Sequence, residues 1–491
     1  MDKFDVAVIG AGLLGCFAAR ELSRYKLNIA LLEAREDVCT GISRANTAIV
    51  YSGCDTAPGT LKTEMCLRAN GSFDALCNEL GVRFSRCGSL MISLGERGDG
   101  VLKKKYEQGQ KNGVPGLRLL SGMEAGGLEP ALTDRVTMAL LAPTTGTVNP
   151  WELGIAAYEN ALNNGVQPRL NEKVISITCR DGGYILETSR GSIFARTVVN
   201  CAGLYSAGVR EMCHGPLVRI FPKRGDYLVF DRSEGGIISR VIFHEPEIKG
   251  KGLTAVPTVD GNLLIGPSEL PLVGDWDFST TEEGMETLLA LCGEILPTLH
   301  RDRLIRSFGA LRPNPFYMEK QADGSLLRDK RGISSFTILS DENGAFLSFV
   351  GIKTPGLTCS RELGAYAAER ISEYLAGEKN ESFDPIRPAP ISLSGVSAAE
   401  RAAAVDKDPL YGRIVCRCAG ISEGEVVDAM RRGATTLDGV KRRAGTGMGR
   451  CQGGFCSTRI MEILARELGK PISEIMKDGP GSFIAGGGGY E

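Results

Sequence analysis

The sequence predicts an α/β protein of several domains, and three observations support this fold class. The first thirty-three residues read as strand, glycine-rich turn, helix and strand. Further strand and helix patterns fill most of the chain, and a C-terminal stretch carries two close pairs of cysteines. At 491 residues the chain is too long for one ordinary hydrophobic core. We therefore expect two to four domains.

The N-terminal stretch has the pattern of a dinucleotide-binding βαβ unit. The apolar run 4–9 predicts a strand, Gly10, Gly12 and Gly15 follow in a GxGxxG turn, and a helical pattern leads to a second apolar run that ends at Glu33. Such glycines permit a tight turn, a close approach to a pyrophosphate and close packing of helix on strand. The helix N-terminus attracts phosphate, and the acidic residue accepts ribose hydroxyls. The sequence therefore predicts a Rossmann-like domain.

Composition excludes several classes of function. The 57 basic and 59 acidic residues give a net charge of −2, which argues against a nucleic-acid partner. No apolar run reaches the length of a transmembrane helix. Eleven of the fifteen cysteines are scattered, which indicates a reducing, cytoplasmic compartment rather than a disulfide scaffold.

Hydrophobic periodicity predicts the remaining elements. Helices are expected over 61–80, 100–112, 151–163 (with Asn149 as a cap), 282–296 and 361–375. Strands are expected over 48–51, 173–179, 184–189, 192–195, 197–200, 218–230, 241–264 and 346–351, and a hairpin over 84–94. The strand that ends at Asn200 and the strand before Gly351 each run into a turn and a helix, which is where α/β folds bind ligands.

The C-terminal cysteines predict a metal centre. Cys416 and Cys418 form a CxC pair, and Cys451 and Cys456 form a Cx₄C pair, with helical patterns at 423–432 and 436–443 between them. Four thiolates can hold an iron–sulfur cluster or one structural zinc. CxC with Cx₄C is not common zinc-finger spacing, and the flanking glycines would offer N–H groups to bridging sulfides. We favour the cluster.

Two stretches make a family resemblance specific. Residues 415–425 and 447–456 resemble the bacterioferritin-associated-ferredoxin-like domain, which carries one 2Fe–2S cluster. The body resembles the glycerol-3-phosphate dehydrogenase and L-2-hydroxyglutarate dehydrogenase branch of the FAD-dependent D-amino-acid-oxidase superfamily. The combination is similar to the large subunit of anaerobic glycerol-3-phosphate dehydrogenases. The motifs that carry the second resemblance lie at 10–15, 43–46, 58–62, 224–227, 257–262, 266–267, 312–313 and 355–358.

The resemblance implies a domain layout. It places an FAD-dependent oxidoreductase at 1–376, with FAD-binding parts near 1–80, 145–215 and 335–376 interleaved with an antiparallel-sheet substrate domain near 81–144 and 216–334. A linker would follow at 377–410, rich in Pro, Ser and charge, then a small helical 2Fe–2S domain at 411–468 and a tail at 469–491.

The implied cofactors are noncovalent FAD and a 2Fe–2S cluster held by the four cysteines. The residues expected to bind FAD are Gly10, Gly12, Leu14, Gly15, Glu33, Ala34, Ser43, Arg44, Asn46, Val174, Ala202, Gly203, Gly351, Pro355, Gly356, Leu357 and Thr358.

For the substrate we expect a small anion. Arg312 and Lys353 are candidates to hold a carboxylate or phosphate. Relatives commonly have His where this chain has Tyr51, so the remaining candidate bases for an alcohol are His244, Tyr51 and Tyr227. The missing His also leaves open an amino-acid or N-substituted glycine substrate, such as proline or sarcosine, because a neutral amine needs no base.

Electrons are expected to leave through the cluster. The chain has no second GxGxxG in a βαβ setting, so no NAD site is expected, and the acceptor would be a partner protein or subunit in a hetero-oligomer. The chain would be cytoplasmic, or peripheral to the membrane through that partner. The alternative is that the cysteine module is structural or docks a partner without redox chemistry.

Overall fold

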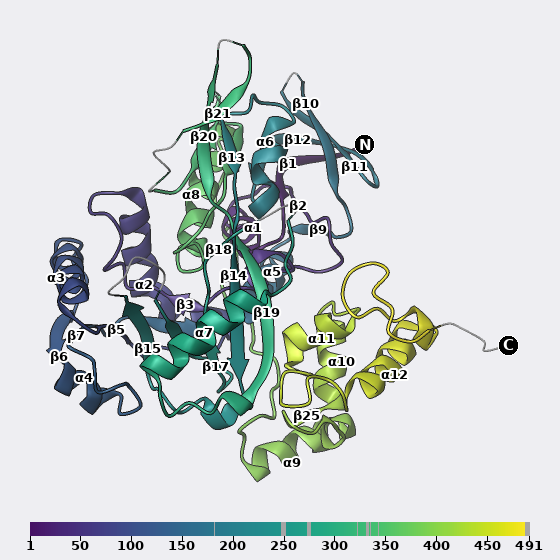
Figure 1. Ribbon diagram of the computed structural model, residues 1–491. Helices are drawn as coiled ribbons and strands as arrows, with labels where there is room; N and C mark the ends of the chain where they lie inside the picture. Colours follow the sequence, from purple (N-terminus) through teal and green to yellow (C-terminus); the bar gives the residue numbers. More distant parts are fainter. Residues whose placement is uncertain are drawn as a thin grey trace. The chain divides into compact units, whose positions relative to one another are not determined.

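The computed structural model describes residues 1–180, 182–246, 252–272, 276–321, 323–329, 333, 335–341 and 343–486 (Figure 1). Residues 247–251, inside the region predicted as strand at 241–264, lie outside this set. The chain divides into two compact units. The first comprises Met1–Ala34 and Val38–Ile386, and the second comprises Arg35–Asp37 and Arg387–Glu491.

The predicted βαβ unit is confirmed at the N-terminus. It consists of β1 (Asp2–Ile9), α1 (Leu13–Leu22) and β2 (Ile29–Leu32). β1 lies between β2 and β12 (Gly191–Asn200) and is parallel to both. Parallel strands buried on both faces are apolar along their whole length. This is why the second half of β1 and all of β2 read as continuous apolar runs.

The first sheet grows outward from these strands. β2 pairs in parallel with β9 (Gln167–Arg169), and β12 pairs in parallel with β23 (Phe346–Phe349). β10 (Val174–Arg180), β11 (Gly183–Thr188) and β22 (Ile338–Ser340) add antiparallel pairings at the edges. The predicted strands 192–195 and 197–200 are one continuous strand, β12. Its first half pairs with β11 and its second half with β23, and this change of neighbour accounts for the break in its pattern.

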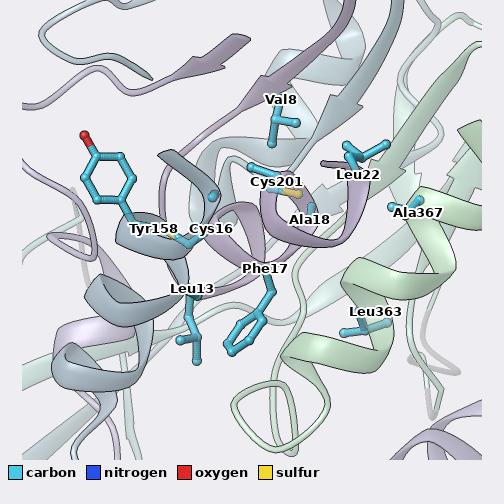
Figure 2. Close-up of a cluster of buried hydrophobic side chains, with 14 of the residues drawn as sticks. Val8, Leu13, Cys16, Phe17, Ala18, Leu22, Tyr158, Cys201, Leu363 and Ala367 are labelled. Carbon is cyan, nitrogen blue, oxygen red and sulfur yellow. The ribbon is translucent and has the colours of Figure 1, made fainter. Parts of the chain in front are cut away.

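Three helices pack around one apolar core in this unit (Figure 2). Leu13 and Phe17 of α1 lie in the same cluster as Tyr158 of α5 (Pro150–Asn163) and Leu363 of α8 (Ser360–Leu375). The Asn149 side chain accepts hydrogen bonds from the first two N–H groups beyond Pro150, which confirms the predicted cap. The packing fixes α1 against β1 and thereby holds the glycine turn between them.

A second, mostly antiparallel sheet forms the other part of the first unit. Its strand order is β18-β14-β17-β16-β15-β5-β7-β6, and β19 pairs antiparallel with β14 along the whole length of that strand. The strands are β5 (Ser89–Ser93), β6 (Arg118–Ser121), β7 (Met138–Ala142), β14 (Lys223–Phe230), β15 (Val241–Glu245), β16 (Thr254–Pro257), β17 (Leu263–Ile265), β18 (Leu270–Pro271) and β19 (Leu304–Arg312). With the parallel-strand domain, this sheet confirms the predicted fold class.

The hairpin predicted over 84–94 is wrong. β4 (Phe84–Ser85) pairs with β8 (Gly146–Val148), which also pairs with β3 (Ile49–Val50). β5 instead pairs antiparallel with β7 and parallel with β15. The two short strands belong to different sheets because their partners lie far away in the sequence.

Other helices and strands complete the first unit. They are α2 (Leu61–Leu80), α3 (Glu96–Lys111), α4 (Gly122–Leu128), α6 (Ser206–Glu211), α7 (Glu282–Ile295), β13 (Val218–Ile220), β20 (Pro315–Lys320) and β21 (Leu326–Arg328). Helix α2 has the predicted bounds, with the Thr60 hydroxyl as its N-cap. Among the described residues, no helix has the length and apolarity needed to cross a membrane.

The second unit is small and mainly helical. It contains α9 (Ala398–Lys407), α10 (Glu423–Arg431), α11 (Leu437–Ala444), α12 (Ser457–Leu468) and a short pair of strands, β24 (Ile414–Cys416) and β25 (Ile421–Ser422). Helix α9 lies within the stretch predicted as a linker. The core of this unit is built from one face of each of α10, α11 and α12 and includes the buried Cys416 and Cys456.

Candidate functional site

The glycine turn after β1 leaves no room for side chains at two positions. Gly10 has φ +96°, and a Cβ there would lie 2.8 Å from the carbonyl oxygen of Cys201. A Cβ on Gly15 would lie 1.8 Å from the carbonyl oxygen of Gly10. The turn is therefore pressed against both its own helix and the end of β12, as the dinucleotide-binding pattern requires.

Two side chains from other segments contact this turn. The Ala11 N–H donates to Glu33 Oε2 at 2.8 Å, and the Leu13 N–H donates to Ser43 Oγ at 2.9 Å. Glu33 is thereby held beside the turn at the end of β2. A carboxylate in this place can accept hydrogen bonds from the hydroxyls of a nucleotide ribose.

The other segments predicted to bind FAD converge on the same region. The Asn46 amide donates to the Ser43 carbonyl at 2.9 Å, and the Gly351 N–H donates to the Ser206 hydroxyl at 3.2 Å. The Tyr51 N–H donates to Thr358 Oγ1 at 3.0 Å. The segments 43–51, 200–206 and 351–358 therefore surround one place near the turn.

The remaining predicted FAD residues lie on or next to these elements. Leu14 is on α1, and Val174 is buried on β10, two residues after Glu172, whose N–H donates to the Glu33 carbonyl. Ala34 and Arg44 are exposed, while the others line the turns after β12 and β23, namely Ala202, Gly203, Pro355, Gly356 and Leu357.

Two tyrosines lie at the antiparallel sheet: Tyr227 is buried on β14, and Tyr51, which follows β3, is half-buried. The Tyr51 ring stacks on Phe243 with 6.0 Å between centroids, and the Tyr227 ring stacks on Phe308 at 4.7 Å. Burial raises the pKa of Tyr51 to about 12 and raises the pKa of Tyr227 as well. Both phenols therefore stay neutral near pH 7, where they can donate hydrogen bonds but remove no proton.

A small cavity of about 30 Å³ adjoins Tyr51. Its lining includes Asp55 and Phe243, and the hydroxyls of Ser89 and Thr145, which are 2.9 Å apart, also line it. This volume is enough for about one water molecule.

The predicted anion-binding residues belong to a cluster of three cations. Arg312 ends β19, Lys353 follows β23, and the third, Lys62, lies in the first turn of α2. Burial lowers the pKa of Lys353, and the charges of Arg312 and Lys62 lower it further. Burial likewise lowers the pKa of Lys62, with a further contribution from Arg312. The three positive charges therefore repel one another across one region.

No carboxylate neutralises this cluster by direct contact. In the part of the chain that the structure describes, Lys62, Arg312 and Lys353 form no ion pair. Lys353 Nζ lies 3.5 Å from Asn314 Oδ1. Lys62 Nζ lies 5.7 Å from the centre of the Phe336 ring. Asp55 is the carboxylate whose charge favours the protonated form of Lys62. A cluster of this kind, in which Lys62 and Lys353 are half-buried and Arg312 is exposed, suits an anionic ligand, above all a dianion.

Lys62 ends the motif at 58–62 but is not among the site residues predicted from the sequence. One local signal could have found it, because a lysine in the first turn of a helix faces the positive end of the helix dipole. A cation in that unfavourable place calls for an explanation such as a ligand of opposite charge.

The structure sets His244 apart from the tyrosines. It lies on β15 next to Phe243, and its N–H donates to the Leu253 carbonyl. Successive side chains on a strand point to opposite faces. Since Phe243 contacts Tyr51, the His244 side chain lies on the opposite face of the sheet.

The four predicted metal ligands lie together in the second unit. The sulfur of Cys418 is 3.8 Å from that of Cys416 and 3.9 Å from that of Cys451. Sulfurs on one tetrahedral metal with bonds of about 2.3 Å are about 3.8 Å apart. Among the described residues, no three Cys, His, Asp or Glu side chains converge as ligands of a single ion would. A binuclear cluster needs only two cysteines at each iron, so the arrangement fits a cluster better than one zinc.

The surroundings favour the thiolate at two of the four cysteines, Cys416 and Cys451. Burial raises the pKa of Cys418, and the hydrogen bond with Cys416 raises the pKa of Cys456. A hydrogen bond from the Cys456 thiol, aided by the N–H groups of Gly447 and Ala419, lowers the pKa of Cys416 to about 5. The N–H of Phe455 is the main cause of the lowered pKa of Cys451. A Cβ on Gly449 would lie 2.6 Å from the Cys418 sulfur, so a larger residue would crowd the site.

Two family descriptions match the chain. Residues 5–370 match the family described as FAD dependent oxidoreductase, and residues 414–466 match the BFD-like [2Fe-2S] binding domain. Together with the glycine turn and the four cysteines, these matches confirm FAD and a 2Fe–2S cluster as the cofactors.

Relatives match the chain over different shares of its length. A glycerol 3-phosphate dehydrogenase from Caloramator mitchellensis is 40% identical over 491 residues, 99% of this chain and 98% of that protein. The mitochondrial L-2-hydroxyglutarate dehydrogenase of Bos taurus is 29% identical, and the match covers 55% of this chain and 61% of that protein.

Solved structures share the fold. The FAD-bound L-alpha-glycerophosphate oxidase of Mycoplasma pneumoniae has a TM-score of 0.70 at 23% identity, over 80% of this chain and all of that one. A Bacillus halodurans glycerol-3-phosphate dehydrogenase complexed with FAD has a TM-score of 0.63 at 18% identity, over 96% of this chain and 91% of that one.

Proposed function

We propose a function from one premise: the chain belongs to the FAD-dependent oxidoreductase family. We infer that it is a dehydrogenase of glycerol 3-phosphate or a related small 2-hydroxy acid, and that its electrons leave through the 2Fe–2S cluster to a partner protein. The observation that carries the substrate proposal is the cluster of Lys62, Arg312 and Lys353, which has no ion-pair partner among the described residues. Tyr51 and Tyr227 lie in the same region, since the charge of Arg312 acts on the pKa of both. A relative that matches 99% of this chain at 40% identity is a glycerol 3-phosphate dehydrogenase.

In the mechanism, the chain holds and orients the substrate. Arg312 and Lys353 would bind the anionic end, Arg312 by its two-pronged guanidinium. Tyr51 Oη and Tyr227 Oη would donate hydrogen bonds to the substrate's hydroxyl or carboxylate oxygens, since both phenols are neutral. FAD, when bound, supplies the acceptor for the hydride. Fixing the reacting carbon near that acceptor is the main contribution that the protein can make.

A second candidate substrate is an amine, on the same fold. The observation that favours it is Tyr51, which stands where relatives commonly have His and which stays protonated up to about pH 12. An alcohol must lose its O–H proton during oxidation, whereas an amine can bind already neutral. In that case the chain would be an amino-acid or N-substituted glycine dehydrogenase.

The substrate test is anaerobic mixing of the purified protein with a small panel, followed by flavin absorbance. The panel holds glycerol 3-phosphate, L-2-hydroxyglutarate, L-lactate, proline and sarcosine. Bleaching by glycerol 3-phosphate or a hydroxy acid supports the first proposal, and bleaching by an amine alone supports the second. No bleaching by any hydroxy compound contradicts the first.

The electron path is tested separately with Cys451→Ser. This variant should still allow flavin reduction by substrate but should lose transfer to the acceptor protein. Unchanged steady-state turnover would show that the cysteine module is structural. We also propose a cytoplasmic setting, since none of the fifteen cysteines forms a disulfide and reduced cysteines persist in reducing compartments.

A further inference from the structure

The cysteine site has a buried side and an exposed side. Cys416 and Cys456 are 0% and 1% exposed, whereas Cys418 and Cys451 lie at the surface of the second unit. A 2Fe–2S cluster held by these four residues therefore has one edge near solvent. Electron transfer between proteins is fastest where the two redox groups approach closely, so this edge is the natural place for an acceptor.

The surface around the exposed cysteines is basic. The two cysteine-bearing segments, 412–420 and 445–459, contain four arginines and no aspartate or glutamate. Arg413 lies 3.7 Å from Glu423, and the three others, all exposed, are Arg417, Arg450 and Arg459. The whole chain carries a net charge of only −2, so this local excess of positive charge does not reflect a generally basic protein.

An exposed aromatic ring contacts two of these arginines. Phe455, next to Cys456, is 42% exposed. The guanidinium carbon of Arg417 lies 4.3 Å from the centre of its ring, and that of Arg459 lies 5.6 Å away. Cation–π contacts of this kind order both arginines around the ring. An exposed aromatic flanked by ordered arginines has the composition typical of the centre of a protein–protein interface.

We propose that Arg417, Phe455 and Arg459 form the docking face for an acidic one-electron carrier protein. This face, the arginine–phenylalanine face, rests on the proposed function, in which the cluster carries electrons out of the chain. In each encounter one electron leaves the cluster, which is oxidised, and the carrier is reduced by one electron. Two encounters account for the two electrons of one substrate molecule, and no bond or proton changes hands at the face.

The positive charge of the arginine–phenylalanine face favours a carrier protein with an acidic surface. A carrier with an acidic patch is attracted over a Debye length of about 10 Å at 0.1 M salt, and a basic carrier is repelled. A second explanation is that the arginines only offset the negative charge of the cluster itself. In that case their removal would change the reduction potential of the cluster and leave carrier binding unchanged.

The test uses Arg459→Glu in the full-length holoprotein. Arg459 lies three residues after Cys456, so its replacement leaves all four ligands and their neighbours unchanged. The matched control is Lys470→Glu, the same change of charge just beyond the other end of α12. Twelve helical residues separate the two ends by roughly 18 Å, so the control is far from the cysteines.

Two probes of opposite charge report on the face: flavodoxin, an acidic carrier, and cytochrome c, a basic one. Binding of oxidised flavodoxin is measured by titration at low and high salt, and reduction of each carrier is measured with dithionite-reduced protein. We expect Arg459→Glu to weaken flavodoxin binding at least 10-fold, to reduce its salt dependence and to speed the reduction of cytochrome c. Lys470→Glu should change each value less than twofold. Phe455→Ala should weaken flavodoxin binding without changing its salt dependence.

Three results would overturn the proposal. The first is an equal effect of Arg459→Glu and Lys470→Glu on flavodoxin binding. The second is a shifted reduction potential with unchanged binding. The third is slower electron transfer from the flavin to the cluster with normal flavodoxin binding, because the face would then serve the entry of electrons. The binding titrations, the carrier reductions and the reduction potential need no substrate, so the face can fail while the proposed dehydrogenase stands, and the reverse.

Discussion

The backbone N–H of Tyr51 donates to the hydroxyl of Thr358 at 3.0 Å, which joins two segments that are 307 residues apart in the sequence. Thr358 is in the turn that leads into α8, and Tyr51 directly follows β3. The hydrogen bond fixes the position of the Tyr51 backbone relative to the turn that is predicted to bind FAD. A residue held in this way can orient a substrate without taking part in proton transfer.

Replacing Tyr51 with Phe tests this role. The variant keeps the ring and its contact with Phe243 but loses the phenolic donor. One hydrogen bond to an anionic substrate contributes about 1.5 kcal/mol or more, so we expect kcat/KM to fall about 10-fold. Because burial raises the pKa of Tyr51 to about 12, the pH profile between pH 6 and 10 should keep its shape. Loss of an inflection in that range would show that Tyr51 titrates and acts as a base.

Lys62→Met tests the three-cation cluster by its substrate affinity. The variant removes one positive charge beside Arg312 and Lys353, and we expect KM for the anionic substrate to rise roughly 10- to 100-fold with a smaller change in kcat. The pKa of Lys353 should rise because Lys62 no longer repels its charge. The loss of affinity at high pH should therefore move to higher pH. An unchanged KM would exclude Lys62 from the binding region.

The same variant has an opposite effect on stability. The pKa of Lys62 in the folded protein is below the ordinary value of 10.5, so its charge destabilises the fold at pH 7. This cost shrinks as the pH rises from the folded pKa towards 10.5, where the unfolded chain also loses its proton. Lys62→Met should raise the thermal midpoint at pH 7 and raise it less near pH 10. Phosphate ions should stabilise the wild type more than the variant.

The sequence predicted best where structure depends on near neighbours. The βαβ unit, the bounds of α2 and the Asn149 cap all follow from local periodicity and capping. The pairing of β5 with β15 could not be predicted, since it joins Ser89–Ser93 to Val241–Glu245 across a long stretch of chain. No local rule sets the register of such strands, and this is why residues 84–94 read as a hairpin.

The residues of the candidate site also fall into those that the sequence predicts and those that only the folded chain brings together. Short motifs with fixed spacing, such as the glycine turn and the two cysteine pairs, could be found from the sequence. The position of Lys62 in the first turn of α2 marks it as unusual, but its nearness to Arg312 and Lys353 joins three separate segments and could not be predicted. The repulsion among the three charges is visible only in the folded chain.

Two glycine-to-alanine substitutions distinguish the steric effect of a new Cβ on FAD binding from the general effect of alanine on helix stability. Gly15→Ala would place its Cβ 1.8 Å from the Gly10 carbonyl oxygen, so α1 or the turn must move. We expect FAD affinity to fall at least 10-fold, measured by flavin fluorescence during dilution. Gly71→Ala on α2 is the control, since a Cβ there meets nothing within 4 Å. It should stabilise the protein by about 0.5 to 1 kcal/mol and leave FAD affinity unchanged. Normal FAD binding by Gly15→Ala would contradict the assignment of the turn.

Asp37→Ala tests a buried charge network in the second unit. The Asp37 carboxylate accepts hydrogen bonds from Arg442 and Arg443, and all three side chains are at most 4% exposed. Although burial acts to raise the pKa of Asp37, the two guanidinium groups outweigh it, and the pKa is lowered from 3.8. Removing the carboxylate takes a shared partner from two buried guanidinium groups, although Arg442 keeps its ion pair with Asp478 at 3.0 Å. Loss of one partner of a buried pair costs about 3 to 5 kcal/mol.

The measurement is the visible circular dichroism of the 2Fe–2S cluster during heating, which reports on the second unit. Asp438→Ala is the control, because its partner Lys477 is 49% exposed and such pairs contribute about 1 kcal/mol or less. In the wild type the stabilisation from Asp37 should be complete well above pH 3.8 and should disappear as the pH falls through its lowered pKa, since the carboxylate then gains a proton. Asp37→Ala should therefore lose this acid dependence and melt at a lower temperature at pH 7. Equal melting of the two variants would mean that the Asp37 network adds no stability to the unit that holds the cluster.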